Sequence, residues 1–576
     1  MFRLLRYLHT CKKETILTPV FVILEVVAEI LIPVFMGILI DDGLNPKNPG
    51  HENMTLVWQC SIIMVILAAL ALLFGMLSSK YAAIVSNQIG RNLRHAQYER
   101  IQDYAFENID HFATSSLITR MTLDVQMVQN AVQMNIRIAF RAPVMIIFSI
   151  VSAAIIGGPM ALIFVGIAPV IGFGIWFVMK SAHQYFVKMF KKIDGLNLDV
   201  QESLAGIRTI KSYVREEKHI KAFEQTVEDV SQNAKKAERW VALNNPIFQF
   251  SIFITFLLVS WFGAYRMVYN GFTEGQFANI ISYVTQVLMS LMMLSQVFLM
   301  IVISKASVKR ITEVLDEKSV LLEIENPLTT VKDGSVIFDH VAFKYSDKMI
   351  LNDINLNIPQ GSFVGIFGAT GTGKTSLVQL ISRLYDVNEG KILVGGKDVK
   401  SYELATLRKE VITVLQKNVL FSGTIADNLR WGKRDATEAE MIQALKQAQA
   451  YEFVMEKTDG LQSHVEQAGV NFSGGQRQRL SIARALIGNP KVLILDDSTS
   501  AVDTKTDALI RQSLKVSAPD MTKIMIAQRL QSLEDANQII LLDSKGIQAI
   551  GTHQSLYASN EMYKATYDAQ AKGKEV

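Results

Sequence analysis

The chain has 576 residues, more than one hydrophobic core uses, so we expect at least two domains. Hydrophobic residues make up 49% of it and charged residues only 19%, a balance that excludes an ordinary soluble enzyme. The formal net charge of +4 is small for this length and gives no case for nucleic acid as a partner. Cys11 and Cys60 are far apart and belong to no CxxC or histidine cluster, so neither a disulfide framework nor a zinc site is indicated.

Long apolar segments fill residues 1–305, which we predict to be a membrane domain. Residues 1–13 mix basic and apolar side chains, a pattern typical of an amphipathic helix on the inner membrane surface. A buried soluble core is the alternative for any single apolar run, but it does not account for several runs with one charge bias. Each predicted span is near the ~20 residues that a bilayer core requires. The six spans are 15–40, 55–79, two within 142–179 joined at Gly157-Gly158-Pro159, 240–265 and 276–304.

Basic residues predict how these spans are oriented. The connections 80–141 and 180–239 are long and rich in Lys and Arg, whereas the opposite connections offer only Lys47 and Arg266. The positive-inside rule therefore places both termini and both long connections in the cytoplasm. Because the long connections contain few helix breakers, we expect the spanning helices to continue well beyond the bilayer.

Two carboxylates interrupt the first span. Glu25 and Glu29 are four residues apart and so share one helix face. Carboxylates inside a membrane usually face a cavity or a cationic partner. Two interpretations stay open: a site that attracts lipophilic cations, or a structural pair with Arg137 or Arg141. Two interpretations also stay open for the last span, because its aromatic and Met side chains could line an adaptable pocket or serve helix packing. These side chains include Tyr283, Met289, Met292, Met293 and Phe298.

After Lys305 the composition changes. Residues 306–334 read as a helix that passes into a linker, and residues 335–576 alternate short apolar strands with amphipathic helices. That alternation predicts an α/β domain with a parallel sheet. The expected fold class is thus a membrane α-helical bundle of six transmembrane helices fused to an α/β domain, whose ligand the next motif indicates.

The segment FVGIFGATGTGKTSLVQLI, residues 363–381, predicts a strand, a glycine loop and a helix. Glycines in the loop let backbone N–H groups point at phosphate oxygens, and the helix adds its positive end. Lys374 would reach the β- and γ-phosphates, and the Thr375 hydroxyl would bind Mg²⁺. A plain glycine turn is the alternative, but all eight motif positions match in the right context. The predicted nucleotide-binding residues here are Gly368, Ala369, Thr370, Gly371, Thr372, Gly373, Lys374, Thr375 and Ser376.

Two further segments belong to the same domain. NFSGGQRQRLSIARAL, residues 471–486, exposes backbone N–H groups at a helix start, which makes a second anion site of Ser473, Gly474, Gly475 and Gln476. One nucleoside triphosphate hardly needs two such sites from one chain, so we expect two domains to meet head to tail. In KVLILDDSTSAVD, residues 491–503, a buried strand ends in Asp496 and Asp497, where open α/β sheets hold their ligands.

In this order, GATGTGKT, FSGGQ and LILDDSTSAVD resemble the Walker A, signature, and Walker B plus D-loop motifs of ATP-binding cassette (ABC) proteins. Six spans ahead of one such domain resemble an exporter half-transporter. The resemblance implies ATP and Mg²⁺ as ligands, with Asp496 holding the metal. The resemblance also implies roles for residues that carry no signal by themselves: Tyr345 alone would be an ordinary aromatic residue of a strand, and Gln416 alone a surface amide. Tyr345 would stack on adenine, Gln416 would sense metal and γ-phosphate, Ser473 and Gly475 would contact the partner's γ-phosphate, and Asp503 would be the D-loop aspartate.

Two positions depart from the family pattern. Asp497 stands where the family normally has the Glu that polarises the attacking water, and a misplacement of about 1 Å can cost ~100-fold in rate. Gln528 stands where the family usually has His, and a neutral amide can neither carry an imidazolium charge nor shuttle a proton. Together they predict a site that binds ATP but hydrolyses it slowly. The signature is nearly standard, with Phe472 in place of the usual Leu.

This asymmetry resembles one half of the heterodimeric bacterial multidrug exporters, so a second, non-identical half-transporter would supply the Glu and the His. The implied function is ATP-driven export of hydrophobic or amphipathic compounds, lipophilic cations among them, across the bacterial inner membrane. The alternatives are a lipid flippase, a peptide exporter, and an ATP-gated channel or regulatory subunit. Residues 107–128, turning at Thr119-Arg120, and residues 202–217 resemble coupling elements that dock on nucleotide-binding domains, the second on the partner's.

Overall fold

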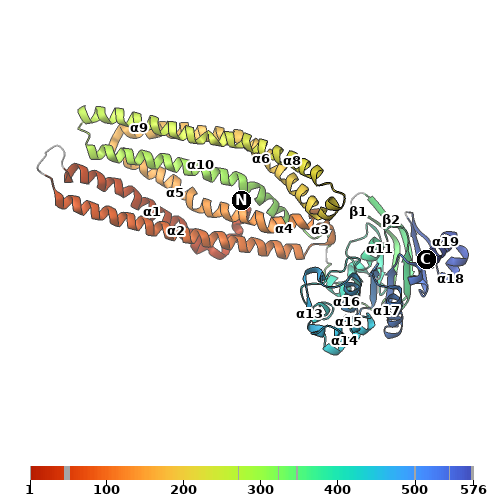
Figure 1. Ribbon diagram of the computed structural model, residues 1–576. Coiled ribbons are helices and arrows are strands. Elements are labelled where there is room, and N and C mark those ends of the chain that lie inside the picture. The colour runs from red at the N-terminus through yellow and green to blue at the C-terminus, as the bar shows by residue number, and fades with distance from the viewer. Residues whose placement is uncertain are drawn as a thin grey trace. The chain divides into compact units, whose positions relative to one another are not determined.

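The computed structural model describes residues 2–44, 52–269, 271–321, 324–345, 348–498, 501–543 and 545–572. The chain forms two compact units (Figure 1). The first contains Met1–Asp103 and Phe112–Lys318, and the second contains Tyr104–His111 and Ser319–Val576. Lys47, which entered the orientation prediction, lies outside the described residues.

The first unit is a bundle of long helices. Among the described residues, five helical stretches are long and apolar enough to cross a membrane, and one of them, Thr114–Ala205, is interrupted by the short turn Gly158–Met160 between its two longest helices. The predicted break at Gly157-Gly158-Pro159 is therefore confirmed, and Gly158 has the positive φ of +54° that the reversal requires. The described helices of this unit are η1 (Phe2–Cys11), α1 (Lys12–Ile38), η2 (Leu39–Gly43), α2 (Met54–Gln102), α4 (Thr114–Thr119), η3 (Arg120–Asp124), α5 (Val125–Gly157), η4 (Gly158–Met160), α6 (Ala161–Ala205), α7 (Ile207–Ser212), α8 (Glu216–Ala242), α9 (Asn244–Tyr269) and α10 (Glu274–Asp316).

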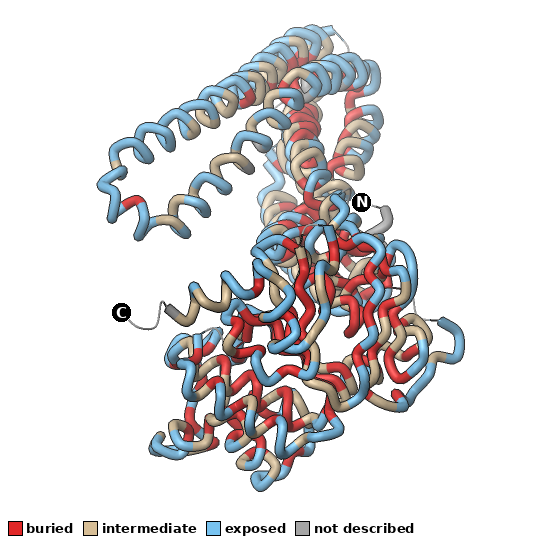
Figure 2. Tube along the Cα trace, turned by 90° about the vertical axis from the view of Figure 1, so that its right-hand side faces the viewer, coloured by how far each residue is buried: buried red, intermediate tan, exposed pale blue. Residues whose placement is uncertain are grey.

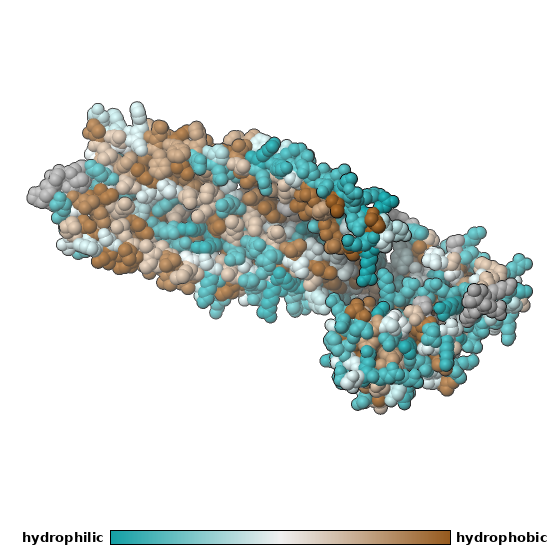
Figure 3. Space-filling view, viewed as in Figure 1, coloured by the Kyte–Doolittle hydropathy of each residue, from teal (hydrophilic) through white to brown (hydrophobic). Residues whose placement is uncertain are grey.

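Several of these helices exceed the thickness of a bilayer. Helix α2 has 49 residues, which at about 1.5 Å per residue is roughly 73 Å, against the ~30 Å of a hydrocarbon core. Apolar side chains such as Val65, Ile155 and Trp261 are 69%, 79% and 73% exposed. In Figure 3 such side chains gather over the part of the bundle that includes the α9–α10 turn. These exposed apolar surfaces suit a membrane-embedded segment, and the polar remainder of each helix extends beyond it.

Helices α1, α2, α5 and α10 pack along one another, and α6 packs along α8 (Figures 1 and 2). Tyr283 of α10 is fully buried in the membrane unit and its hydroxyl donates to the Ile30 carbonyl at 3.1 Å. Tyr283 thus serves helix packing, one of the two interpretations of the last span. Phe298 is instead 47% exposed.

The predicted turn at Thr119-Arg120 is wrong. The chain reverses earlier, between Asp103 and Ala113, through the short helix α3 (Phe106–Phe112). Ala113 has a positive φ of +56°, so the break lies there, and Thr119-Arg120 is part of the helical run that enters α5. Arg120 donates to Glu313 and to the Arg310 carbonyl, both at 2.9 Å, which fixes it within the bundle. The second hairpin turns at α7, inside residues 202–217; its docking on a partner stays a prediction.

The second unit contains two larger sheets. The six-stranded sheet has the order β12-β11-β3-β10-β9-β6; its strands pair in parallel except β12, which pairs antiparallel to β11. The four-stranded antiparallel sheet has the order β2-β1-β4-β5. The strands are β1 (Val336–Tyr345), β2 (Lys348–Ile358), β3 (Phe363–Phe367), β4 (Glu389–Val394), β5 (Lys397–Asp398), β6 (Val411–Val414), β7 (Gly423–Thr424), β8 (His464–Val465), β9 (Val492–Asp496), β10 (Thr522–Ile526), β11 (Gln538–Asp543) and β12 (Gly546–Gly551).

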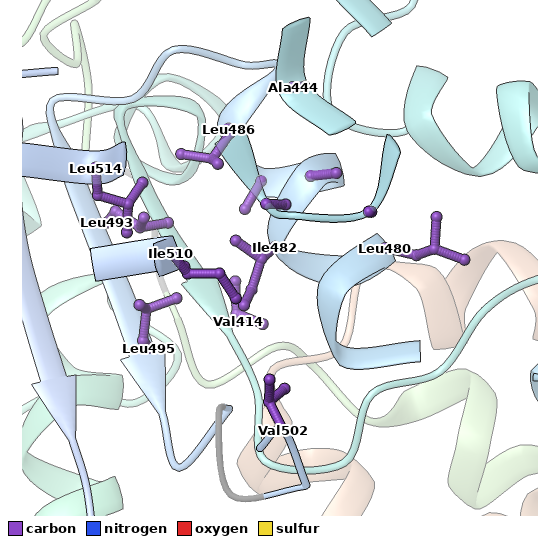
Figure 4. Packing of buried hydrophobic residues seen from close by; sticks show 14 of the residues in the cluster. Val414, Ala444, Leu480, Ile482, Leu486, Leu493, Leu495, Val502, Ile510 and Leu514 are labelled. Carbon is purple, nitrogen blue, oxygen red and sulfur yellow. The ribbon is translucent and has the colours of Figure 1, made fainter. Parts of the chain in front are cut away.

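Helices cover the parallel sheet, because its central strands are apolar on both faces. Every residue of β9 and β10 is buried, which is why both segments read as continuous apolar runs rather than alternating ones. Figure 4 shows β9 residues Leu493 and Leu495 packing with Ile510 and Leu514 of α17. The helices of this unit are α11 (Lys374–Ile381), α12 (Leu404–Glu410), α13 (Ile425–Arg430), α14 (Glu438–Gln447), α15 (Tyr451–Met455), α16 (Gly474–Leu486), α17 (Thr504–Ser517), α18 (His553–Ser559) and α19 (Glu561–Lys572), with short 3-10 turns η5 (Val399–Ser401), η6 (Gly460–Gln462), η7 (Gln467–Gly469) and η8 (Leu530–Leu533).

Residues 306–316, assigned by sequence to the linker, lie in α10, and the second unit resumes at Ser319. The predicted α-helical membrane bundle fused to an α/β domain is confirmed.

Candidate nucleotide site and membrane cavities

Asp496 is the last residue of β9, flanked in the sheet by β6 and β10. Its side chain is 2% exposed, and the Thr375 hydroxyl donates to its Oδ1 at 3.1 Å. A buried strand thus presents a carboxylate at the carboxyl edge of a parallel sheet, opposite a hydroxyl at the start of α11. The sequence predicted this placement from the abrupt end of the apolar run.

Asp497 turns the chain out of the sheet. Its φ is +48°, a left-handed conformation that Asp adopts more readily than most residues. Its N–H donates to the Ile526 carbonyl at 3.1 Å, which ties it to the end of β10. Just beyond that end, the Gln528 amide donates to Asp497 Oδ2 at 2.6 Å, and the Gln416 amide lies 3.4 Å from the same oxygen. The structure therefore brings together the three residues that were predicted to be catalytic.

The glycine loop connects β3 to α11 in conformations that need glycine. Gly371 and Gly373 have φ of +85° and +90°. A Cβ on Gly368 would lie 2.1 Å from the carbonyl oxygen of Leu542, so no side chain fits there. The loop backbone can therefore curl as a phosphate cradle does.

Lys374 lies over this loop. Its ammonium donates to the carbonyls of Gly368 and Ala369 at 2.8 and 2.7 Å. Burial lowers the pKa of Lys374, while the Asp497 and Asp496 carboxylates act in the opposite direction. Burial also raises the pKa of both carboxyl groups. The ammonium of Lys374 and the loop N–H groups thus lie at one cavity, where both attract a polyphosphate.

A cavity of about 490 Å³ unites most of the predicted site. Thr372 instead turns its hydroxyl onto the Ala369 carbonyl at 2.9 Å and is 7% exposed. The residues around the cavity are Lys348, Ile350, Phe367, Gly368, Ala369, Thr370, Gly371, Gly373, Lys374, Thr375, Ser376, Gln416, Asp496, Asp497, Ile526 and Gln528.

The donor set fits a magnesium ion carried by a nucleotide. The oxygens of Thr375 and Asp496 converge, and Gln416 offers a third oxygen nearby. Mg²⁺ prefers oxygen ligands and keeps several waters and phosphate oxygens, so it needs few protein ligands. Within the described residues no group of three His, Cys, Asp or Glu could hold a metal by itself.

The signature residues are not among those that surround this cavity. Ser473 is the N-cap of α16, where its hydroxyl accepts from the Gln476 N–H at 3.3 Å and the Gln476 side chain accepts from the Ser473 N–H at 3.0 Å. Gln478 accepts from the Ala501 N–H at 3.0 Å, which joins the signature helix to the D-loop. Asp503 follows as the N-cap of α17. This hydrogen bond holds the start of the signature helix beside Ala501 of the D-loop.

Tyr345 lies at the end of β1, on the glycine-loop side of the antiparallel sheet. Its hydroxyl accepts from Ser376 at 3.3 Å and donates to Gln379 at 3.4 Å. Its ring meets that of Tyr385 edge to face, with centroids 5.2 Å apart. Tyr345 is thus adjacent to the glycine-loop helix but not among the residues around the cavity, and its stacking on adenine stays a prediction.

Tyr385 also contacts the segment Tyr104–His111, which belongs to the second unit although it follows α2 in the chain. The Tyr385 hydroxyl donates to Asp110 at 2.7 Å, and the Phe106 ring lies 6.1 Å from the Tyr385 ring. Burial and the Asp110 carboxylate raise the pKa of Tyr385, so the hydroxyl remains a donor. Sequence reasoning missed this contact; a tyrosine close after a glycine-loop helix carries no distinctive signal.

A charged cluster lies in the membrane unit. Arg141 donates to both oxygens of Glu29 at 2.6 and 2.7 Å, and Arg137 lies 3.5 Å from Glu25. The Ser78 hydroxyl is 3.4 Å from the same Glu25 carboxylate. The pairing with Arg137 and Arg141 is therefore real. The four charged residues also face a cavity of about 720 Å³, so a ligand could still reach them.

A second membrane cavity, of about 430 Å³, is almost wholly apolar. Phe298 and Leu294 of α10 and Trp176 of α6 contribute to it. Its size is within the range of small-molecule pockets.

Comparisons with known proteins agree with this geometry. A profile of the ABC transporter transmembrane region matches residues 15–291, and one of the ABC transporter matches residues 351–500. The ABC transporter ATP-binding protein YfiB of Bacillus subtilis is 32% identical over 96% of this chain and 95% of its own length. This chain belongs to the ABC transporter family. As an ABC transporter, it binds nucleotide and couples ATPase activity to movement across a membrane.

Other relatives have names that differ in substrate. YheI of Bacillus subtilis, named a multidrug resistance ABC transporter ATP-binding/permease protein, is 33% identical over 70% of this ABC transporter and 69% of its own length. The ATP-dependent lipid A-core flippase of Sodalis glossinidius is 28% identical over 97% of this chain and 96% of its own. A solved structure of a bacterial Atm1-family ABC exporter with ATP bound superposes with a TM-score of 0.87 at 23% identity, covering 98% of this chain and 99% of that one. This last likeness shows the exporter fold.

Sequence reasoning missed Lys348 in this ABC transporter. It begins β2 and is one of the residues around the nucleotide cavity. A lone Lys at a strand end has no motif, so only the fold reveals it.

Proposed function

We propose that this ABC transporter is one half of a heterodimeric exporter of hydrophobic and amphipathic compounds, and that its own ATPase site is degenerate. The observation that carries the proposal is the 2.6 Å hydrogen bond between the Gln528 amide and Asp497. The side chain at position 497 is one methylene short of the usual Glu, and its carboxylate accepts an amide proton. The Gln528 and Gln416 amides both lie at Asp497 Oδ2, so a water molecule must compete with them for that oxygen.

The second half-transporter would be a non-identical chain. Two halves meet head to tail, so the Ser473 loop of this chain closes over the partner's nucleotide. Two features of this loop support that role: the capping box between Ser473 and Gln476, and the hydrogen bond from Ala501 of the D-loop to Gln478. Turnover then occurs mainly at the site that holds the partner's catalytic residues, while ATP stays longer at the site of Lys374 and Asp496.

Nucleotide binding at this chain's own site uses the glycine loop, Lys374 and the Thr375–Asp496 pair. When bound, Mg²⁺ would be held by Thr375, Asp496 and Gln416 and would neutralise phosphate charge. Both termini and the nucleotide-binding domain lie in the cytoplasm of a bacterial cell, in line with the basic long connections. No nucleic acid takes part.

The test is the ATPase activity of the full chain, purified alone and reconstituted in nanodiscs. We expect the wild type to be nearly inactive and Asp497→Glu/Gln528→His to gain substantial turnover, since the two changes restore the usual base and switch residue. A triple variant that adds Lys374→Ala should lose the gained activity, which shows that the activity comes from this site.

Two results would contradict the proposal. A wild-type chain that alone turns over at a transporter-like rate would point to a homodimer with two working sites. A double variant that binds the fluorescent analogue TNP-ATP yet stays inactive would show that positions 497 and 528 do not explain the low ATPase activity of the wild-type chain.

Two membrane cavities support amphipathic substrates, because one is apolar and the other contains Glu25, Glu29, Arg137 and Arg141. The relative named as a flippase makes lipid movement the second candidate. Proteoliposomes that contain the assembled pair distinguish the two: ATP-dependent uphill movement of ethidium favours drug export, and movement of an NBD-labelled phospholipid between leaflets favours a flippase. A unitary conductance would favour a channel instead.

A further inference from the structure

The second unit contains another cavity, of about 670 Å³, beside strands β3, β9 and β10 and helix α17. Phe363 and Lys523, near the starts of β3 and β10, border it. The far ends of the same strands, Phe367 and Ile526, border the nucleotide cavity. The two cavities share no lining residue, although Leu495 and Met525 of this cavity directly precede Asp496 and Ile526 of the nucleotide cavity in their strands.

The floor of this cavity is apolar. Leu495 of β9, Leu514 of α17 and Met525 of β10 are each 5% exposed or less and contribute to it. Figure 4 shows Leu495 and Leu514 among the packed side chains between β9 and α17. An apolar floor of this kind favours a hydrocarbon or aromatic group over water.

Positive charges surround the floor. Arg511, Lys515 and Lys523 border the cavity, against one carboxylate, Asp535. Arg511 already binds Asp535 at 2.9 Å and Asp507 at 3.3 Å, so those three charges largely satisfy one another. Among the described residues, neither Lys515 nor Lys523 forms an ion pair. The Asp520 carboxylate also favours the charged form of Lys523, but it does not border the cavity. Lys515 and Lys523 are therefore the two described cations of the cavity that form no ion pair.

Lys523 is the unusual member of this group, because it is 6% exposed inside the edge of the sheet. Its ammonium donates to the Ala518 carbonyl at the C-cap of α17, the only hydrogen bond that the described residues give it. An ammonium has three donors, and an incompletely satisfied buried charge is costly. Burial accordingly lowers the pKa of Lys523. Capping α17 accounts for one donor and leaves the others for a ligand.

We propose that this cavity binds a small amphiphilic carboxylate, with its apolar body on Leu495, Leu514 and Met525 and its carboxylate between Lys515 and Lys523. A single negative charge suits the site better than a phosphate dianion, since one of its two cations is buried and each further charge would have to lose its hydration. The volume is that of a drug-sized ligand. This site lies outside the ATPase cycle described above.

The test uses 4-benzoylbenzoate, a photoreactive aryl carboxylate, with the full chain in nanodiscs. After illumination, peptide mass spectrometry should find saturable labelling within residues 504–525. Lys515→Gln and Lys523→Gln should each raise the half-saturating concentration about tenfold, the loss expected for a hydrogen bond to a charged group. Lys505→Gln is the matched control, because Lys505 is on the same helix but does not border the cavity. Uncharged benzophenone should not label these peptides saturably.

Binding of TNP-ATP reports whether each variant is folded. If Lys523→Gln fails to fold, Lys515→Gln decides, because its side chain is exposed and its loss cannot disturb the core. Labelling that does not saturate, or that is unchanged by Lys515→Gln, would overturn the proposal and leave Lys523 as a helix cap alone.

Discussion

The side chains of Asp496 and Asp497 are adjacent in sequence but have different surroundings. Asp496 receives a hydroxyl from the glycine-loop helix, whereas Asp497 receives amides from Gln528 and Gln416. Backbone geometry explains the difference. Asp496 is the last residue of the extended strand β9, whereas the backbone of Asp497 is left-handed, and its own side chain lies at Gln528, just beyond the end of β10. Neighbouring carboxylates can therefore have separate functions, one toward metal and one toward water.

We predict that Asp496→Asn abolishes the effect of magnesium on nucleotide affinity. Wild-type protein should bind TNP-ATP more tightly in Mg²⁺ than in EDTA, and Asp496→Asn should reduce that ratio by about 10-fold or more, because it removes the anionic oxygen that faces Thr375. Asp497→Asn is the control and should keep most of the ratio. Equal losses in the two variants would contradict the separation of their roles.

In the membrane unit we predict that Glu29→Gln lowers stability. Arg141 donates to both Glu29 oxygens, and loss of that carboxylate leaves the partly buried guanidinium with only Glu25, 3.7 Å away, as a counter-charge. Since both side chains keep some exposure, the expected cost is about 1–3 kcal/mol, measured as a lower thermal midpoint in detergent. The double variant Glu29→Gln/Arg141→Gln should recover part of the loss. An unchanged midpoint with weaker ethidium binding would instead favour a cation site.

At the scale of elements, the segment Tyr104–His111 follows α2 in the chain but belongs to the nucleotide-binding unit. We predict that Tyr385→Phe preserves TNP-ATP binding but loosens this segment, because it removes the 2.7 Å hydrogen bond to Asp110. Amide hydrogen exchange in residues 104–111 should become about 10-fold faster, as expected for a lost bond to a charged group.

The matched control is Tyr567→Phe, which removes a tyrosine hydroxyl that donates to Glu534 elsewhere in the same unit. It should leave exchange in residues 104–111 unchanged. Comparable exchange in wild type and Tyr385→Phe would show that ring packing on Phe106, rather than the hydroxyl, holds the segment.

Sequence patterns predicted these elements unevenly. Uncharged runs located the membrane helices, and Gly157-Gly158-Pro159 located a turn, because lipid and backbone sterics leave few alternatives. The turn between α2 and α5 was misplaced at Thr119-Arg120, since residues 103–113 contain neither Gly nor Pro. What fixes that turn is its contact with Tyr385, more than 270 residues away. No local pattern reports such a contact.

At the scale of the molecule, motif spacing predicted one complete phosphate cradle and one signature loop, and the structure places the signature residues away from the cavity of the cradle. This separation agrees with the proposal that a second chain completes each site.

The complex purified through a tag on this chain should contain a second, non-identical ABC half, which mass spectrometry identifies.

In that complex we predict that Ser473→Ala lowers ATP turnover by about 100-fold, since one transition-state donor is lost at the competent site. Asp497→Asn should change turnover less than about twofold, because its site contributes little hydrolysis. Thr437→Ala is the control for helix capping, because Thr437 forms the same capping box on α14 that Ser473 forms on α16. This control variant should lose the stability that a helix cap contributes but keep its ATP turnover. The reverse order, with Asp497→Asn disabling the complex and Ser473→Ala harmless, would assign the competent site to this chain.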